Sequence, residues 1–183
     1  MDEELKRQVL HILVGIGAIA CLLYFGRGFM IAAVFFTIII GTVLINARLL
    51  GKKIGIVQWF ERHFERPGVL FPGWGSACYA AGVLIPLAFL LDTSGIAAIV
   101  FILAVGDGVS TAVGRRGRIT LPYNEKKTLE GSIAFLLASL PAYYFIGEAV
   151  FPLALIGALV EGIDFGIDDN LMIPIACTLV VIL

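Results

Sequence analysis

The chain has 183 residues, of which 60% are hydrophobic and only 15% are charged, and its formal net charge is −1. Its mean hydropathy is +0.99. Soluble domains are about 45–50% apolar and about 25% charged, so this composition excludes a water-soluble globule, a disordered chain and a disulfide scaffold. The composition predicts an all-α, polytopic membrane helix bundle, with residues 1–183 forming a single integral membrane domain.

Hydrophobic segments recur along the chain, several of them close to the roughly 20 residues that a transmembrane helix needs. We expect about seven transmembrane helices, and Pro141 predicts a kink in the fifth. The last two segments are short, which fits tilted or partly re-entrant helices as well as full crossings. The predicted segments are 9–25, 29–50, 74–91, 95–113, 128–146, 149–163 and 171–183.

The basic residues are distributed very unevenly between the loops. Twelve of the 13 Lys and Arg residues, Arg66 among them, lie before the first segment, at the end of the second segment (Arg48), or in the loops after the second and fourth segments, and Arg27 is the exception. Because cytosolic loops are enriched in Lys and Arg, the N-terminus and the loops after segments two, four and six should be cytosolic. The compact chain with short loops favours the cell membrane of a prokaryote.

Segment 52–66 is amphipathic. Ile56, Phe60 and Phe64 recur every four residues, and the charged residues fall on the opposite face of the predicted helix. This pattern indicates an interfacial helix that lies on the membrane. It could serve as an anchor only, or as a gate or wall for a lipid substrate.

Asp107 is an ionisable residue within the apolar segment 95–113. Such residues are costly in a membrane and are usually functional. The flanking Gly106 and Gly108, with Gly114 beyond, permit a close backbone approach or an unwound turn. The alternative is a structural ion pair with a neighbouring arginine.

The loop 114–128 is rich in basic residues, including Arg115, Lys126 and Lys127. Arginine and lysine suit phosphate oxygens. Glu130 follows at the start of the next helix, whose N-terminal backbone donors also favour anions. The loop therefore predicts a phosphate site, although a plain basic cytosolic loop has the same composition.

The segment 159–170 is strongly acidic. It contains Glu161, Asp164, Asp168, Asp169 and Asn170 and has no basic residue. Clustered carboxylates repel one another unless a cation neutralises them, and a ligand set of oxygen atoms alone favours Mg²⁺. An exposed acidic turn is the alternative.

Acidic and basic platforms on one face predict a substrate that is both anionic and metal-bound, which is the description of a nucleoside triphosphate or diphosphate. The sequence contains no Walker A pattern and no Rossmann fingerprint, so membrane helices would have to build the site. We expect no nucleic-acid partner, because the cluster at 115–118 is small and is offset by acidic residues.

These motifs resemble the polyprenol kinase family, which includes dolichol kinase, phytol kinase and CTP-dependent diacylglycerol kinase. The resemblance is carried by Gly106-Asp107 with Gly114, by residues 127–131, and by Glu161 with residues 168–174. Residues 4–11 and 71–82 resemble two further motifs, so the similarity covers nearly the whole chain. Gln8 departs from the family, which often has a lysine there.

The resemblance implies a membrane enzyme that moves the γ-phosphoryl group of CTP onto a lipid alcohol, of polyprenol, isoprenoid or diacylglycerol type; CTP as the donor comes from the resemblance alone. We expect Asp107, Glu161 and Lys127 to act in catalysis, with Glu161 as a metal ligand or as the base for the lipid hydroxyl. The expected Mg²⁺ ligands are Asp107, Glu161, Asp168 and Asp169. The expected nucleotide-binding residues are Arg7, Gly106, Gly108, Gly114, Arg115, Lys126, Lys127, Glu130 and Asn170, with His11 as a secondary candidate.

Two other functions stay open at this point. A related enzyme could transfer CMP to a lipid phosphate and make a CDP-lipid, although the longer signature of phosphatidate cytidylyltransferases is missing. A small ion- or proton-coupled transporter could use Asp107 as a relay. The acidic residues of this chain gather at one face of the membrane, and this arrangement does not favour a transporter. A lipid-facing surface and a subunit interface have similar compositions here, so the sequence makes no prediction of oligomeric state.

Overall fold

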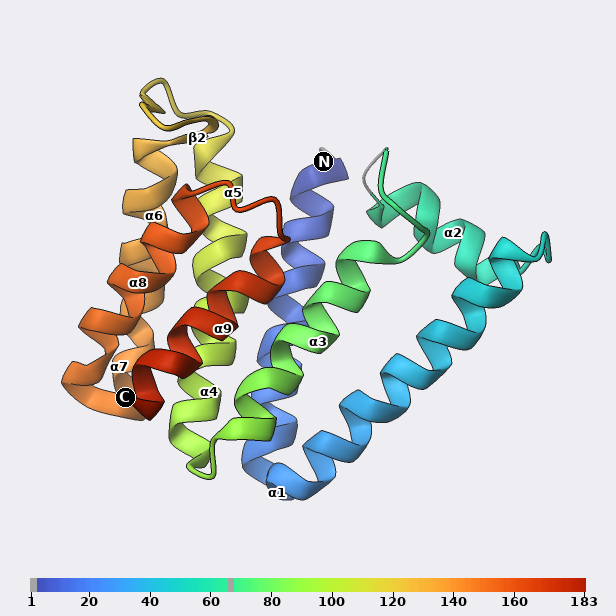
Figure 1. Cartoon of the computed structure of the whole chain (residues 1–183), viewed down its shortest axis with the longest axis horizontal. Helices are drawn as coiled ribbons and strands as arrows, with labels where there is room; N and C mark the ends of the chain where they lie inside the picture. The colour runs from blue at the N-terminus through green and yellow to red at the C-terminus, as the bar shows by residue number, and fades with distance from the viewer. Residues whose placement is uncertain (1–2, 66–67) are drawn as a thin grey trace.

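The computed structural model describes residues 3–65 and 68–183, so Arg66 lies outside the described residues. It confirms the all-α prediction, with one short hairpin as the exception (Figure 1). The helices are α1 (Glu3–Leu49), α2 (Gly55–Phe64), α3 (Trp74–Phe89), α4 (Thr93–Phe101), the π-helix η1 (Ile102–Asp107), α5 (Gly108–Gly114), α6 (Leu129–Ser139), η2 (Leu140–Ala142), α7 (Tyr143–Ile146), η3 (Gly147–Ala149), α8 (Val150–Gly162) and α9 (Asp169–Ile182).

Helix α1 consists of two arms that meet at Gly26. This residue has φ of 83°, a conformation that glycine adopts without strain. The first arm (residues 3–25) and the second arm (residues 27–49) match the first two predicted segments and run in opposite directions (Figure 1). Arg27 follows the turn, and its Nε donates a hydrogen bond to the carbonyl oxygen of Leu87 at 2.9 Å. This bond ties the turn to the end of α3.

The elements α4, η1 and α5 form one helical rod from Thr93 to Gly114 that runs through the centre of the bundle. Asp92 caps its N-terminus, where the carboxylate accepts hydrogen bonds from the backbone N–H groups of Ser94 and Gly95. The π-helical turn ends at Asp107. Such turns inside α-helices are rare and occur frequently at functional sites.

The loop between α5 and α6 folds into a hairpin that the sequence analysis did not predict. Strand β1 (Thr120–Leu121) pairs antiparallel with β2 (Asn124–Thr128). The carboxylate of Glu130 accepts the backbone N–H of Arg118 at 2.8 Å and that of Ile119 at 3.3 Å. These bonds close the base of the hairpin against the start of α6.

The segment predicted as one helix over 128–146 is interrupted at the expected kink. Helix α6 ends at Ser139, and a 3₁₀ turn follows that contains Pro141. Because proline has no backbone N–H, the α-helical hydrogen bonding stops there. After α7, Gly147 has φ of 57° and reverses the chain into α8.

Three described helical stretches are long and apolar enough to cross a membrane, judged by length and composition: Glu3–Leu49, Thr93–Gly114 and Leu129–Gly162. Helices α3 and α9 are apolar but shorter. The first and third stretches fold back on themselves, at Gly26 and Gly147, so each supplies two arms (Figure 1). The number of about seven crossings stays a prediction.

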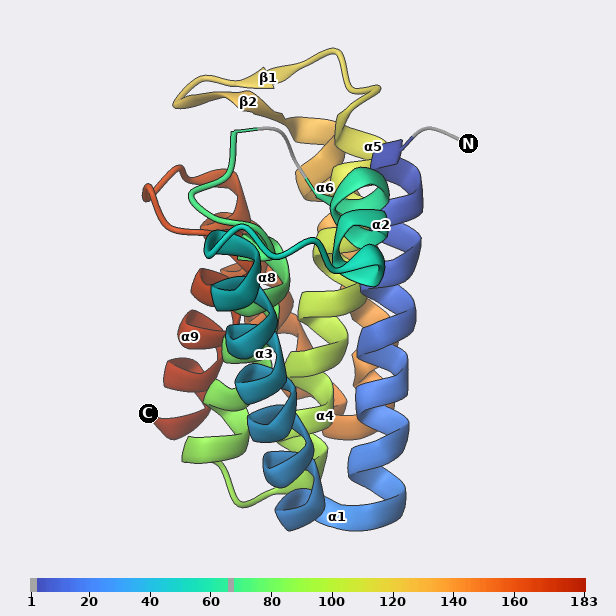
Figure 2. The ribbon, with the colours of Figure 1, turned by 90° about the vertical axis from the view of Figure 1, so that its right-hand side faces the viewer.

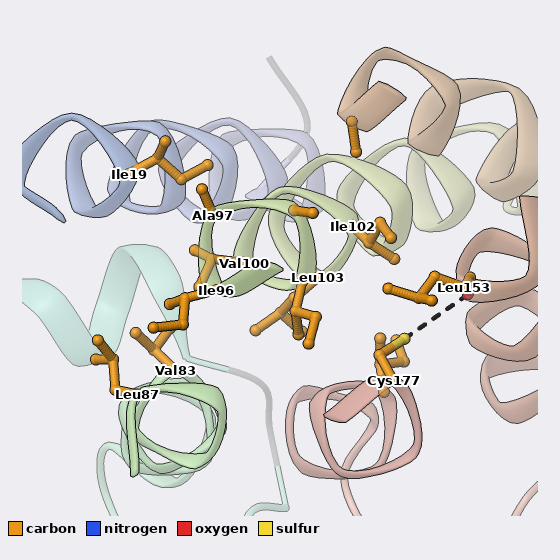
Figure 3. Close-up of a cluster of buried hydrophobic side chains, with 14 of the residues drawn as sticks. Ile19, Val83, Leu87, Ile96, Ala97, Val100, Ile102, Leu103, Leu153 and Cys177 are labelled. Carbon is orange, nitrogen blue, oxygen red and sulfur yellow. Dashed lines mark hydrogen bonds between the residues drawn. The ribbon is translucent and has the colours of Figure 1, made fainter. Parts of the chain in front are cut away.

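The hydrophobic core surrounds the central rod. Ile96, Val100 and Leu103 of this rod are at most 2% exposed and pack toward α1, α3, α8 and α9 (Figure 3). The thiol of Cys177 in α9 donates to the carbonyl oxygen of Leu153 in α8 at 3.7 Å. In a bilayer, close packing rather than hydrophobic burial holds helices together, so these contacts fix the helix positions around the site.

The connections fall into two groups at opposite ends of the bundle. The start of α1, α2, the hairpin and the α8–α9 connection lie at one end, and the turn within α1, the α3–α4 connection and the C-terminus lie at the other (Figures 1 and 2). The sequence analysis assigned the first group of connections to one face, from the basic residues of the N-terminal segment and of the loops after the second and fourth segments, and from the number of crossings. That this end faces the cytosol stays a prediction.

Candidate active site

Three carboxylates from distant parts of the chain meet at the hairpin end of the bundle. Asp107 ends η1, Glu161 lies in the last turn of α8 and Asp169 begins α9. One oxygen atom from each lies within 4.8 Å of the others. Asp107 is 7% exposed and Glu161 is 2% exposed. Carboxylates this close and this buried need a cation to offset their charge.

Lys127 of β2 supplies one such charge. Its Nζ donates to Glu161 Oε1 at 2.5 Å and to Asp169 Oδ2 at 2.8 Å. Burial acts to lower the pKa of Lys127, but the carboxylates of Asp169, Glu161 and Asp107 raise it above its usual value, so the amine stays protonated. One lysine does not neutralise three carboxylates, so the cluster keeps negative charge that a further cation would offset.

Asp169 has an altered acidity. Burial raises the pKa of its carboxyl group to about 6; Lys127 opposes the shift, and the charges of Asp107 and Glu161 add to it. Together, Asp107, Glu161 and Asp169 offer only oxygen atoms, the ligand type that Mg²⁺ prefers. The donor set therefore fits the metal that the sequence analysis expected.

Asp168, the fourth expected metal ligand, has a different contact. Its carboxylate accepts the backbone N–H of Asn170 at 3.0 Å and the side-chain amide N–H of Asn170 at 2.8 Å. This is the N-cap of α9, and it lies outside the cluster of three carboxylates. Within the described part of the chain, the buried Oδ1 atom of Asn170 has no hydrogen-bond partner.

Two residues that the sequence analysis did not single out hold the cluster in place. Ser110 is 2% exposed, and its hydroxyl donates to Glu161 Oε1 at 2.9 Å. Asn124 of β2 donates its amide N–H to the carbonyl oxygen of Gly162 at 3.0 Å, which joins the hairpin to the end of α8. Ser110 follows Asp107 by three residues and so shares its helix face, a signal that could have identified it.

Thr128 fixes the other side of Lys127. Its hydroxyl accepts the backbone N–H of Gly131 at 3.2 Å as the N-cap of α6, and it donates to the carbonyl oxygen of Gly114 at 3.2 Å. The position of Lys127 is therefore set by the hydrogen bonds of Asn124, which precedes it in β2, and of Thr128, which follows it. Lys126 instead pairs with the exposed Asp164 at 2.9 Å, and both residues line the cavity next to the cluster.

The first turns of α1 border the cluster. His11 Nε2 lies 3.7 Å from Asp107 Oδ2 and 3.2 Å from the carbonyl oxygen of Leu103, and its ring contacts that of Tyr79 with the centroids 4.4 Å apart. Arg7 forms an ion pair with Glu4. His11 and Arg7 both line the cavity next to the cluster, and their role in nucleotide binding stays a prediction.

The glycines expected to bind nucleotide lie at helix contacts. A Cβ atom at Gly106 would come within 2.6 Å of Ser139 Oγ on α6, and one at Gly108 within 2.8 Å of Ile12 Cγ1 on α1. Gly114 packs against Gly131 of α6 and also lines the cavity, as does the exposed Arg115. Glu130 faces the hairpin base instead and is absent from the described residues that line the cavity.

The cluster opens into a cavity of about 1210 Å³. Its lining includes Asp107, Lys127, Glu161 and Asp169 together with many apolar side chains. A single cavity therefore combines a charged region with an apolar one, as a site for a phosphorylated compound and a lipid requires.

The chain is similar to proteins from an archaeon and from plants. It is 33% identical to an uncharacterized protein of Methanocaldococcus jannaschii, over 94% of this chain and 89% of the other. It is 31% identical to a probable chloroplastic phytol kinase of Triticum aestivum, over 100% of this chain and 68% of the other. It is 29% identical to the chloroplastic farnesol kinase of Arabidopsis thaliana, over 97% of this chain and 64% of the other.

This chain spans roughly two thirds of the length of these plant kinases, 64% and 68% in the two cases. No protein-family model matches the chain, and no solved structure matches it. The similarity to the phytol and farnesol kinases extends over nearly all of its residues, in agreement with the motifs singled out in the sequence. The chain therefore belongs to the polyprenol kinase family.

Proposed function

We propose that the protein is a membrane kinase that transfers the γ-phosphoryl group of CTP to the hydroxyl group of a lipid alcohol, with Mg²⁺ as cofactor. The observation that carries this proposal is the position of Lys127 between Glu161 and Asp169, with Asp107 in the same cluster, at the wall of a cavity that many apolar side chains also line. The names of the plant relatives support a lipid alcohol as the acceptor.

The donor set supports Mg²⁺. Asp107 and Asp169 would hold the ion, and Glu161 lies close enough to complete the set. When bound, Mg²⁺ would supply positive charge that offsets the negative charge of the phosphate groups. Phosphoryl transfer otherwise depends mainly on positioning and on electrostatic stabilisation, which the chain's own residues provide.

We assign Lys127 to the transferred phosphoryl group. Its Nζ is held by two carboxylates and stays charged, so it can donate hydrogen bonds to phosphate oxygens without a change of protonation. Arg7 and Arg115 line the same cavity and would bind the remaining phosphates.

We assign Glu161 to the acceptor. The carboxylate is 2% exposed, and Ser110 and Lys127 both donate to its Oε1 atom, which fixes its orientation. A buried, oriented carboxylate can accept the proton that leaves the lipid hydroxyl as the new P–O bond forms and the bond between the γ-phosphorus and the departing CDP breaks. The proton acceptor then lies beside the cation that binds the phosphoryl group.

The experiment uses the purified protein with CTP labelled at either the α or the γ phosphate, Mg²⁺, and a panel of lipid alcohols and lipid phosphates. Transfer of γ-label to an alcohol supports the kinase, and parallel reactions with γ-labelled ATP test the choice of CTP. Transfer of α-label to a lipid phosphate would instead identify a CDP-lipid synthase. No transfer from any nucleotide to any lipid would refute both enzymes.

A further inference from the structure

His11 lies beside the carboxylate cluster, although the phosphoryl transfer proposed above does not use it. The residue belongs to the first arm of α1 and lines the cavity. Its Nε2 atom lies 3.2 Å from the carbonyl oxygen of Leu103 and 3.7 Å from Asp107 Oδ2. Both of these residues belong to the π-helical turn η1, in which Asp107 is the last residue. One ring nitrogen of His11 therefore faces both the backbone and the functional side chain of the same turn.

The contact with Leu103 determines which ring nitrogen of His11 carries a hydrogen. A carbonyl oxygen can only accept a hydrogen bond, so Nε2 must be the donor. A ring nitrogen that carries a hydrogen has no lone pair to offer to a metal ion. The nitrogen that faces Asp107 is therefore not a metal ligand, and its N–H group instead presents partial positive charge to the carboxylate.

The π-helical turn decides the direction in which Asp107 points. A π-helix bonds residues that are five apart, so it holds one residue more than an α-helix in the same turn. If η1 relaxed to an α-helix, Asp107 would rotate about the helix axis by about 100°, the angle per residue at 3.6 residues per turn. At present one oxygen atom of Asp107 lies within 4.8 Å of one oxygen atom each of Glu161 and Asp169. A contact that stabilises η1 therefore also keeps Asp107 in the cluster.

Neighbouring residues hold His11 against this turn. Its ring contacts that of Tyr79 in α3, with the centroids 4.4 Å apart, and the Tyr79 hydroxyl donates to the carbonyl oxygen of His11 at 3.4 Å. One turn further along α1, a Cβ atom at Gly15 would overlap the Cβ atom of Ala104, so glycine lets the first arm approach the central rod closely. The imidazole is thus fixed at the rod by two helices.

We propose that His11 is a positioning residue, whose Nε2–H group stabilises the π-helical turn and thereby keeps the Asp107 carboxylate in the cluster. This proposal rests on the proposed function, in which Asp107 is a ligand of Mg²⁺. It differs from the sequence-based expectation that His11 binds the nucleotide. The two roles are separable, because a positioning residue changes the affinity for the metal ion, whereas a nucleotide-binding residue changes the affinity for CTP.

Three substitutions test this role. His11→Phe removes both ring nitrogens but keeps an aromatic ring against Tyr79. His11→Gln is the conservative variant, because its longer amide can place an N–H donor near the position of Nε2. His63→Phe is the matched control: His63 also contacts a backbone carbonyl, that of Trp59 at 2.7 Å, but it is absent from the described residues that line the cavity.

The binding experiment titrates each purified protein in detergent with Mg²⁺ alone and measures the Kd by calorimetry. H11F should raise the Kd for Mg²⁺ by about tenfold or more, the usual loss when a residue that orients a metal ligand is removed. H11Q and H63F should stay within about threefold of the wild type, and at saturating Mg²⁺ the Kd of H11F for CTP should stay within about twofold. Equal Kd values for Mg²⁺ in H11F and H63F, or a loss in H11F for CTP alone, would overturn the proposal.

The same titration separates this proposal from the proposed function. A wild type that binds Mg²⁺ with these differences between variants but phosphorylates no alcohol would refute the kinase and keep the role of His11. A wild type that binds no Mg²⁺, alone or with CTP, would refute the metal site and the role of His11 with it.

Hydrogen exchange tests the turn itself and needs no metal. The backbone amides of residues 103–108 should exchange about tenfold or more faster in H11F than in the wild type, H11Q or H63F, because local opening becomes easier. The amides of residues 96–100, in the same rod, should exchange equally in all four proteins. His11→Asn covers a failure of H11F to fold, since it stays polar but its shorter amide does not reach the position of Nε2. H11N should match the results expected of H11F, and H11N that behaves as H11Q does would overturn the proposal.

Discussion

Lys127 Nζ lies 2.5 Å from Glu161 Oε1, although 34 residues separate the two in the chain. The contact joins a hairpin strand to the last turn of α8, and Asn124 and Thr128 fix the strand on either side of the lysine. A charged amine held in this way is preorganised, so it need not reorganise when charge develops on a phosphoryl group.

Substitution of Lys127 by methionine should remove this preorganised charge. Loss of one such donor typically lowers kcat by about 100-fold to 1,000-fold, and we expect a loss of that order for K127M. K53M is the control, because Lys53 is exposed and is absent from the described residues that line the cavity. Transfer of γ-label to phytol measures both. Equal losses in the two variants would contradict the assignment of Lys127.

Asp168 and Asp169 are neighbours with different contacts, so substitution distinguishes their roles. Asp169→Asn should raise the Mg²⁺ concentration for half-maximal activity by about tenfold or more. Asp168→Ala should leave that concentration unchanged but lower the free energy of unfolding by about 1 kcal/mol, because it removes the N-cap of α9. Titration of activity with Mg²⁺ after treatment with EDTA, together with thermal unfolding, measures both effects. A shifted Mg²⁺ requirement in D168A would return Asp168 to the metal site.

The sequence alone did not distinguish the roles of Asp168 and Asp169. The acidic segment 159–170 was identified from composition alone, but the register of α9 decides which side chain caps the helix and which joins Asp107 and Glu161. That register depends on packing between helices. The apolar segments were readily located because hydrophobic length is encoded locally.

The hairpin escaped prediction for a related reason. Its two short strands pair over only a few residues, and Glu130 closes the hairpin base by accepting backbone N–H groups. The sequence analysis assigned Glu130 to the nucleotide because it follows a basic loop. Only the fold of the loop places its carboxylate toward Arg118 and Ile119.

Gly82 should be needed for the contact between α3 and α9. A Cβ atom there would lie 1.9 Å from the carbonyl oxygen of Asn170, so one of the two backbones would have to move. Such overpacking costs about 1–3 kcal/mol. For a chain of this size, this corresponds to a fall in melting temperature of about 2–12 °C for Gly82→Ala.

Gly41→Ala is the control for this substitution, since the added methyl group meets nothing within 4 Å and alanine favours the helix. Its melting temperature in detergent should equal or exceed that of the wild type. A melting temperature of G82A within the error of the wild type would show that α9 can shift away from α3 at no cost. The position of Asn170 would then be less firmly set than the contact indicates.

The hairpin end of the bundle should face the cytosol. Glu125 on the hairpin and Glu148 at the opposite end are both exposed, so Glu125→Cys and Glu148→Cys place one thiol on each side of the bilayer. In oriented vesicles, a membrane-impermeant maleimide should label E125C only from the cytosolic side and E148C only from the other. The wild type measures labelling of its own cysteines, of which Cys78 and Cys177 are buried. The reverse pattern would place Lys127 and the carboxylate cluster on the side without cytosolic CTP, and labelling of both variants from one side would contradict the predicted number of crossings.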